Sequence, residues 1–141
     1  MDIETLRNYC LSLSPEVEEK FPFQQFKAAK DILVFYIKRH MFCYFDINDL
    51  SRVTVKCGEA DVVRLQEAHD CIGPPYQSNA SYAKSWVSID VTTAETKLIK
   101  KLISQSFEII KSKYEKKKKD GYRPKASLTA KLNTAGEPQK R

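Results

Sequence analysis

The sequence predicts an α+β fold in which helices pack against an antiparallel sheet in two layers. Two observations predict it. Short runs rich in β-branched and aromatic residues follow one another with only tight turns between them, and strands joined this closely pair antiparallel. Amphipathic helical patterns precede the runs, interrupt them once and follow them, so helices can cover one face of the sheet. With 141 residues, 42% of them hydrophobic, the chain suits one domain of this kind.

The first predicted elements are a helix over residues 2–13 and a short edge strand. Asp2 suits the N-cap of the helix, and Pro15 ends it. VEEKFPF, residues 17–23, favours an edge strand because Pro22 cannot donate a ladder hydrogen bond. The apolar residues of the helix recur at helical spacing: Ile3, Leu6, Cys10 and Leu13.

The strongest strand patterns are ILVFYI, residues 32–37, and HMFCYFDI, residues 40–47. Only Lys38 and Arg39 stand between them, so the two segments predict a tight hairpin. Such a turn favours glycine or Asn-Gly, and neither occurs at this point of the chain. Either a turn residue carries strain, or the turn is longer than two residues.

Two further strands and a short helix follow. SRVTVKC, residues 51–57, and KSWVSIDV, residues 84–91, both alternate along the chain. A helix over residues 59–70 is predicted between them, with these side chains inward: Val62, Val63 and Leu65. In the second strand Trp86 shares a face with polar side chains, so the only tryptophan of the sequence is expected on the polar side. Those polar neighbours are Lys84, Ser88 and Asp90.

The longest predicted helix spans residues 93–117. Thr92 and Glu95 form the pattern of a capping box, and Gly121 suits the end of the helix. Residues 120–141 show no period that holds and predict a basic flexible tail, which leaves residues 1–119 as a single α+β domain. The apolar stripe of the helix consists of Ile99, Leu102, Ile103, Phe107, Ile110 and Tyr114.

Positive charge gathers at one end of the sequence. The net charge is +6. Residues 111–141 carry eleven Lys or Arg against three acidic residues, a local +8, whereas residues 1–110 carry thirteen against fifteen, a local −2. The predicted body is therefore slightly acidic, and a basic segment follows it.

The cysteine pattern and the N-terminus predict a cytoplasmic protein. The cysteines are far apart with no C-x-x-C pair, which favours free thiols in a reducing compartment: Cys10, Cys43, Cys57 and Cys71. The first residues lack the basic and apolar regions of a secretory signal. No apolar run approaches the length of about 18 residues that a membrane span needs, so no membrane partner is expected.

The order of these elements and several short motifs resemble the MmcQ/YjbR family over about residues 1–118. The motifs are Phe-Pro-Phe at 21–23, Met-Phe at 41–42 and Ala-Lys-Ser-Trp-Val at 83–87. The resemblance implies a CyaY-like α+β fold and a DNA-binding role, because the family's members are usually described as DNA-binding proteins with a double-wing arrangement. By position, four residues fall in the family's aromatic and Lys/Trp segments: Tyr76, Asn79, Lys84 and Trp86.

The predicted functional site is a basic and aromatic surface that contacts DNA largely without sequence preference. Cations neutralise phosphates, and an aromatic ring can stack on a base. Two structural interpretations stay open beside this hypothesis. Trp86 can pack in the interior with Lys84 extending past it, and the lysine run can be a solvated helix end matched to the helix dipole. The predicted site residues are Lys56, Tyr76, Asn79, Lys84, Trp86, Lys116, Lys117, Lys118 and Lys119.

Other functions are alternatives. A protein-interaction or small-ligand module would use a cleft between Tyr76 and Trp86. A frataxin-like metal site is a weaker alternative, because the acidic residues near Lys20 do not form a continuous ridge: Glu16, Glu18 and Glu19. The sequence shows no nucleophile beside a recognisable base and no glycine-rich phosphate loop. We therefore expect no enzymatic activity, no cofactor and no bound metal.

Overall fold

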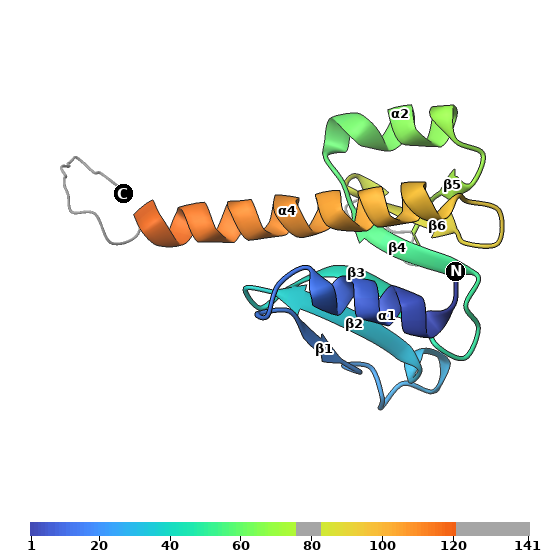
Figure 1. The fold of residues 1–141 in the computed structure, drawn as a ribbon, viewed down its shortest axis with the longest axis horizontal. Coiled ribbons are helices and arrows are strands. Elements are labelled where there is room, and N and C mark those ends of the chain that lie inside the picture. The colour runs from blue at the N-terminus through green and yellow to red at the C-terminus, as the bar shows by residue number, and fades with distance from the viewer. Residues whose placement is uncertain (76–82, 121–141) are drawn as a thin grey trace. The chain divides into compact units, whose positions relative to one another are not determined.

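The computed structural model describes residues 1–75 and 83–120, with side chains up to residue 115 (Figure 1). The chain divides into two units, Met1–Lys111 and Ser112–Arg141. The first unit contains the whole sheet. The described part of the second unit is a continuation of the last helix.

The sheet has six strands in the order β1-β2-β3-β4-β6-β5, and every neighbouring pair is antiparallel. This arrangement confirms the predicted α+β class with an antiparallel sheet. The strand bounds are β1 (Glu18–Lys20), β2 (Ile32–Ile37), β3 (His40–Asp46), β4 (Arg52–Lys56), β5 (Ile72–Gly73) and β6 (Trp86–Asp90).

The α-helices of the described residues are α1 (Ile3–Ser12), α2 (Glu59–Ala68) and α4 (Thr96–Asp120), and a short 3₁₀ helix, η1, spans Lys27–Ala29. As predicted, Asp2 caps α1 by accepting a hydrogen bond from the Thr5 backbone N–H at 2.8 Å. The Tyr9 hydroxyl donates to the Lys100 carbonyl at 3.2 Å, which places α1 beside α4. None of the helices in the described ranges combines the length and the apolar character of a membrane span.

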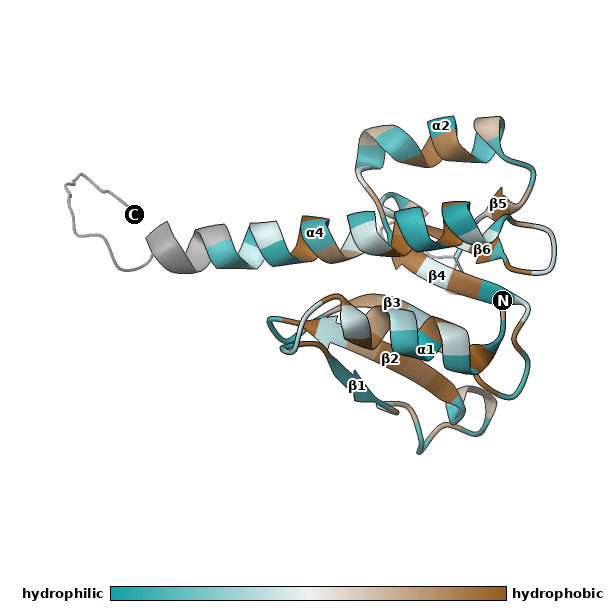
Figure 2. Cartoon of the chain, viewed as in Figure 1, coloured by the Kyte–Doolittle hydropathy of each residue, from teal (hydrophilic) through white to brown (hydrophobic). Residues whose placement is uncertain are grey.

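One face of the sheet, called the helix face below, packs against α1 and α4 and forms the main core. Phe35, Cys43, Val55 and Val87 stand side by side in one row across four strands. Cys10 of α1 reaches this row, because its Sγ lies 3.9 Å from the Sγ of Cys43. Figure 2 shows hydrophobic residues along β2 and an alternation of hydrophobic and hydrophilic residues along α4, as a half-covered helix requires.

A β-bulge lets two consecutive residues of β3 face the helices. The register shifts between the pairs Phe35–Cys43 and Tyr36–Met41, so Phe42 is the extra residue. The ring of Phe42 lies edge-on to that of Phe107 in α4, with centroids 5.4 Å apart, while the neighbouring Cys43 contacts α1. The bulge therefore adds a large aromatic side chain to the core beneath α4.

Ser106 of α4 joins β3 to β4 where the two strands stop pairing. Its hydroxyl donates to the Phe42 carbonyl and accepts the Lys56 backbone N–H, and its side chain is fully buried. The regular pairing of these strands ends at Cys43 and Val55. The serine therefore satisfies two backbone groups that the sheet leaves without a strand partner.

The opposite face of the sheet, called the second face below, carries a smaller cluster of buried side chains. Its members are Val34, Tyr44 and Trp86, with Phe23, Ile32, Tyr36 and Met41 packed against them. Thr54 and Ser88 continue the row of Val34 and Tyr44 across β4 and β6, and their buried hydroxyls share a 2.8 Å hydrogen bond. Both faces of the central strands are therefore buried.

The β2–β3 turn contains two residues, and both carry the strain that its sequence predicts. Ile37 pairs with His40, and between them Lys38 has φ 53° and Arg39 has φ 69°. Both angles lie in the left-handed region that favours glycine. The turn is not lengthened to avoid this conformation.

Three sequence predictions need correction, and one short strand has no counterpart among them. The last helix begins at Thr96, so Thr92 is not its cap; the Thr92 hydroxyl and N–H instead donate to Asp90, which closes a tight turn. Val63 is 61% exposed and does not face inward. The first strand covers only Glu18–Lys20 of the predicted 17–23. The two-residue strand β5 was not predicted, because so short a segment shows no alternation.

The four cysteines are free thiols, as predicted. Cys10, Cys43 and Cys57 are buried, and Cys71 is half-buried. Burial raises the pKa of the Cys57 thiol to about 11 and also raises that of Cys43. Cys43 and Cys57 therefore stay protonated at neutral pH and behave as small apolar side chains.

Candidate nucleic-acid interface

The structure brings together two of the predicted site residues, Lys56 and Trp86. Lys56 ends β4 and Trp86 begins β6, and the two residues pair directly across the strands. Lys84 lies two residues before Trp86 and is exposed. Tyr76 and Asn79 lie outside the described residues. The lysine run 116–119 belongs to α4, but its side chains are also outside the described part of the chain.

The Lys56 ammonium is held in place by two groups of β6 and the segment before it. Its Nζ lies 5.6 Å from the centroid of the Trp86 ring and donates to the Ser85 hydroxyl at 2.9 Å. The backbone of the same region is fixed as well, because the Cys57 N–H donates to the Ser85 carbonyl at 2.8 Å. A cation over an indole gains electrostatic stabilisation without losing its charge.

Trp86 is buried, so of the two interpretations left open by the sequence the structure supports an indole packed in the interior. Only 7% of the residue is exposed, and its ring packs against Tyr44 with centroids 6.1 Å apart. Alternation along the strand did place Trp86 on the second face, but that face is covered at this point. An indole packed in this way does not stack on a base; it supports the Lys56 ammonium instead.

The other end of the β4–β6 pair is electrostatically different. Arg52 stands opposite Asp90 in the register. The pKa of Asp90 is lowered by hydrogen bonds from the Thr92 side chain and backbone, so its carboxylate is ionised at neutral pH. One cationic and one anionic residue therefore stand opposite each other at that end, and the positive charge of this region is concentrated at Lys56 of β4 and at Lys84 just before β6.

Helix α4 carries the largest excess of positive charge among the elements. From Thr96 to Asp120 it contains nine lysines against two glutamates and one aspartate, a net +6. Lys97 and Lys101 are exposed, whereas the Lys111 ammonium lies 5.8 Å from the ring centroid of Phe107. The net charge of this one helix equals that of the whole chain.

The frataxin-like alternative has no support in the described residues, where no group of three or more His, Cys, Asp or Glu could hold a metal ion. The three glutamates at the start of the sheet are instead engaged in ion pairs. Glu16 pairs with Lys38 at 3.2 Å, and Glu18 pairs with Lys20 at 3.5 Å. The Glu19 carboxylate accepts two hydrogen bonds from the guanidinium of Arg7 in α1.

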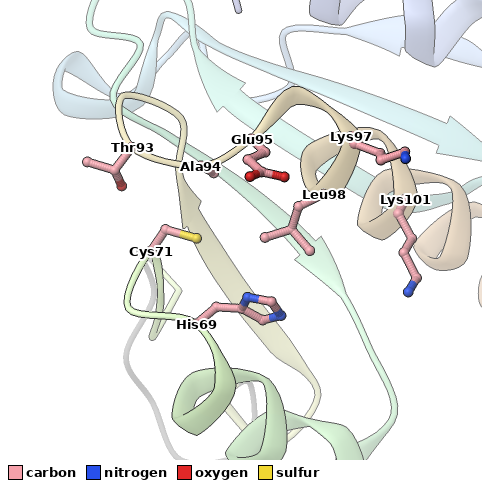
Figure 3. A pocket seen from close by; sticks show the side chains of 8 residues that line it. All are labelled: His69, Cys71, Thr93, Ala94, Glu95, Lys97, Leu98 and Lys101. Atoms are coloured by element: carbon pink, nitrogen blue, oxygen red, sulfur yellow. The ribbon is translucent and has the colours of Figure 1, made fainter.

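A cavity of about 390 Å³ lies at the start of α4, and no local sequence pattern predicts it (Figure 3). Its walls come from the segment after α2, from the turn between β6 and α4 and from the first turns of α4, and more than twenty residues of sequence separate the first of these from the other two. Figure 3 shows the Cys71 thiol and the Leu98 side chain pointing into this space. The lining residues are His69, Cys71, Thr93, Ala94, Glu95, Lys97, Leu98 and Lys101.

Comparison with known proteins identifies the family. The YjbR family model matches residues 12–109, which is more than half of the chain. A Deinococcus radiodurans crystal structure with a DUF419 domain is 24% identical, with a TM-score of 0.70, and the match covers 94% of this chain and 96% of the other. A Pseudomonas syringae crystal structure is 19% identical, with a TM-score of 0.62, covering 77% of this chain and 98% of the other. No curated protein matches the sequence. The family match and the shared fold confirm the resemblance drawn from the sequence motifs, and this chain belongs to the YjbR family.

Proposed function

We propose that this protein is a non-catalytic DNA-binding protein that holds phosphates through lysine side chains, largely without sequence preference. The observation that carries the proposal is the concentration of charge in α4, nine lysines against three acidic residues. Lysine ammonium groups neutralise phosphates and release condensed counterions, which provides affinity for any DNA sequence. Family membership is compatible with this function and does not by itself specify one.

Lys56 and Lys84 are the proposed phosphate contacts on the sheet. The indole of Trp86 and the hydroxyl of Ser85 hold the Lys56 ammonium, so less side-chain entropy is lost when it meets a phosphate. Exposed Lys84 lies close by in the sequence. Tyr76 is the residue proposed to stack on a base, and Asn79 is proposed as a polar contact to DNA. Both residues lie outside the described part of the chain.

Fluorescence anisotropy with a labelled DNA duplex tests this function. We expect binding at low salt that weakens steeply as salt rises, because each phosphate contact contributes about 0.9 to the slope of log K against log salt. The Lys84→Ala substitution should reduce that slope by about 1 and weaken binding equally for unrelated sequences. Lys30→Ala, which removes an exposed lysine just after η1, is the matched control and should leave the slope unchanged. Absence of binding at low salt would contradict the proposal.

A further inference from the structure

The β2–β3 turn is the strained part of the described backbone. Within residues 1–75 and 83–120, Lys38 and Arg39 are the only non-glycine residues with positive φ. A two-residue hairpin turn of this hand favours Asn-Gly, and side chains with a Cβ disfavour the left-handed region. Backbone strain of this kind clusters at ligand-binding sites, where the surrounding structure maintains it. The strained conformation therefore indicates that Lys38 and Arg39 have a function that asparagine and glycine could not perform.

The same two residues line a cavity of about 330 Å³, called the turn cavity below. The rest of its wall consists of Pro15, Glu16, Glu18 and Tyr36. The β3 bulge begins at the pair Tyr36–Met41, next to this cavity in the hairpin. Bulges redirect side chains and occur beside functional sites. A strained turn, a bulge and a cavity therefore coincide at one end of β2.

The charges of the turn cavity favour an anionic ligand. The carboxylate of Glu16 is 3.2 Å from the Lys38 ammonium, and that of Glu18 is 3.5 Å from the Lys20 ammonium, so these acids and lysines compensate one another in pairs. Arg39 is exposed, and its guanidinium has no ion-pair partner among the described residues. A guanidinium presents a planar fork of donors that matches the oxygens of a phosphate.

Tyr36 adds an aromatic ring to this charged site. The ring is half-buried, and the Lys20 ammonium lies 5.4 Å from its centroid. Burial raises the pKa of its hydroxyl, which therefore remains a neutral hydrogen-bond donor at physiological pH. An aromatic ring beside cations is the combination that holds a base together with its phosphate.

We propose that the turn cavity binds a nucleotide, with the phosphate held by Arg39 and the base placed against Tyr36. This site is distinct from the lysines of α4 and β4, and the proposal does not depend on the DNA-binding function above. A free mononucleotide and the phosphorylated end of a DNA strand present the same chemistry to it. The two sources are separated by experiment.

The decisive variant is the double substitution Lys38→Asn/Arg39→Gly, which installs the residues that the turn geometry favours. It should relieve strain and raise Tm by a few degrees, about 2–8 °C. Binding of adenosine 5′-monophosphate, followed by amide NMR shifts, should weaken by about tenfold or more, because the variant cannot make charge-assisted hydrogen bonds to the phosphate. A structural role for the two side chains predicts the opposite change in Tm.

One control, one further variant and three ligand probes complete the test. Lys27→Gln/Lys30→Gln removes two positive charges from exposed positions and should leave nucleotide binding within about twofold, since neither lines the turn cavity. Tyr36→Leu should reduce the affinity for the mononucleotide to that for inorganic phosphate.

Shifts at residues 16–18 and 36–40 with the mononucleotide identify a free nucleotide as ligand, and the same shifts only with a 5′-phosphorylated oligonucleotide identify a strand end. Absence of shifts with both probes, or unchanged binding by the double variant, would overturn the proposal.

Discussion

Ser106 shows how much a single buried side chain can contribute in this fold. Its hydroxyl donates a hydrogen bond to the Phe42 carbonyl and accepts one from the Lys56 N–H, at the point where β3 and β4 separate. Lys56 is also a proposed phosphate contact, so the same serine connects α4 to the backbone of the candidate interface. No local pattern predicts this role, because an isolated serine in an amphipathic helix is usually a solvated residue.

The Ser106→Ala substitution should lower the free energy of unfolding by about 1–3 kcal/mol, because it leaves two backbone groups without their partner. Urea unfolding followed by circular dichroism measures the change. Ser104→Ala on the same helix is the matched control, since Ser104 is only half-buried and its replacement by a good helix former should change stability little. Equal stabilities of the two variants would contradict the bridging role.

Trp86 marks the limit of residue-scale prediction from sequence. The alternating pattern correctly assigns it to the face of β6 that points away from α1 and α4. It cannot reveal what covers that face, because the contacts with Tyr44 and Val34 come from strands distant in the sequence. Burial depends on tertiary packing, whereas the direction of a side chain depends on the strand alone.

The emission of Trp86, the only tryptophan, tests the packed position of the indole. A tryptophan residue that is only 7% exposed should emit at short wavelength and resist quenching by acrylamide. Because the ring supports Lys56 and does not stack on bases, saturating DNA should leave the emission maximum in place. Strong quenching by DNA in titrations of the wild-type protein would show that the indole does contact bases.

At the scale of elements, strands with a regular pattern are predictable and irregular backbone is not. The segments 32–37 and 40–47 match β2 and β3 almost to the residue, because β-branched and aromatic residues fill both. The strain of their turn also follows from the absence of glycine. The bulge at Phe42 and the strand β5 were missed, since each depends on neighbouring elements that local sequence does not encode.

The start of α4 was misplaced for a physical reason. Thr92 and Glu95 have the spacing of a capping box, but Asp90 competes for the Thr92 hydroxyl and N–H. The tight turn formed by Asp90 ends β6, and the helix therefore begins only at Thr96. Aspartate accepts such local hydrogen bonds readily, so this turn prevails over the capping box.

At the scale of the whole molecule, charge distribution is the most informative property of the sequence. The excess of lysine at one end is evident from counting, and the structure shows that much of it belongs to one helix. The site geometry is less predictable: Lys56 and Trp86 are thirty residues apart and meet only because β4 pairs with β6. Antiparallel pairing of strands that are not consecutive is set by the global fold.

The salt dependence of duplex binding, with and without the lysine run, tests the central claim most directly. Replacing Lys116, Lys117, Lys118 and Lys119 with glutamine removes four of the nine lysines of α4 and keeps residues with good helix propensity. If these side chains hold phosphates, the slope of log K against log salt should become shallower by about 1 for each phosphate that is no longer neutralised, up to about 4. An unchanged slope and affinity, measured by anisotropy with the same duplex, would contradict the claim that the lysine run at the end of α4 binds DNA.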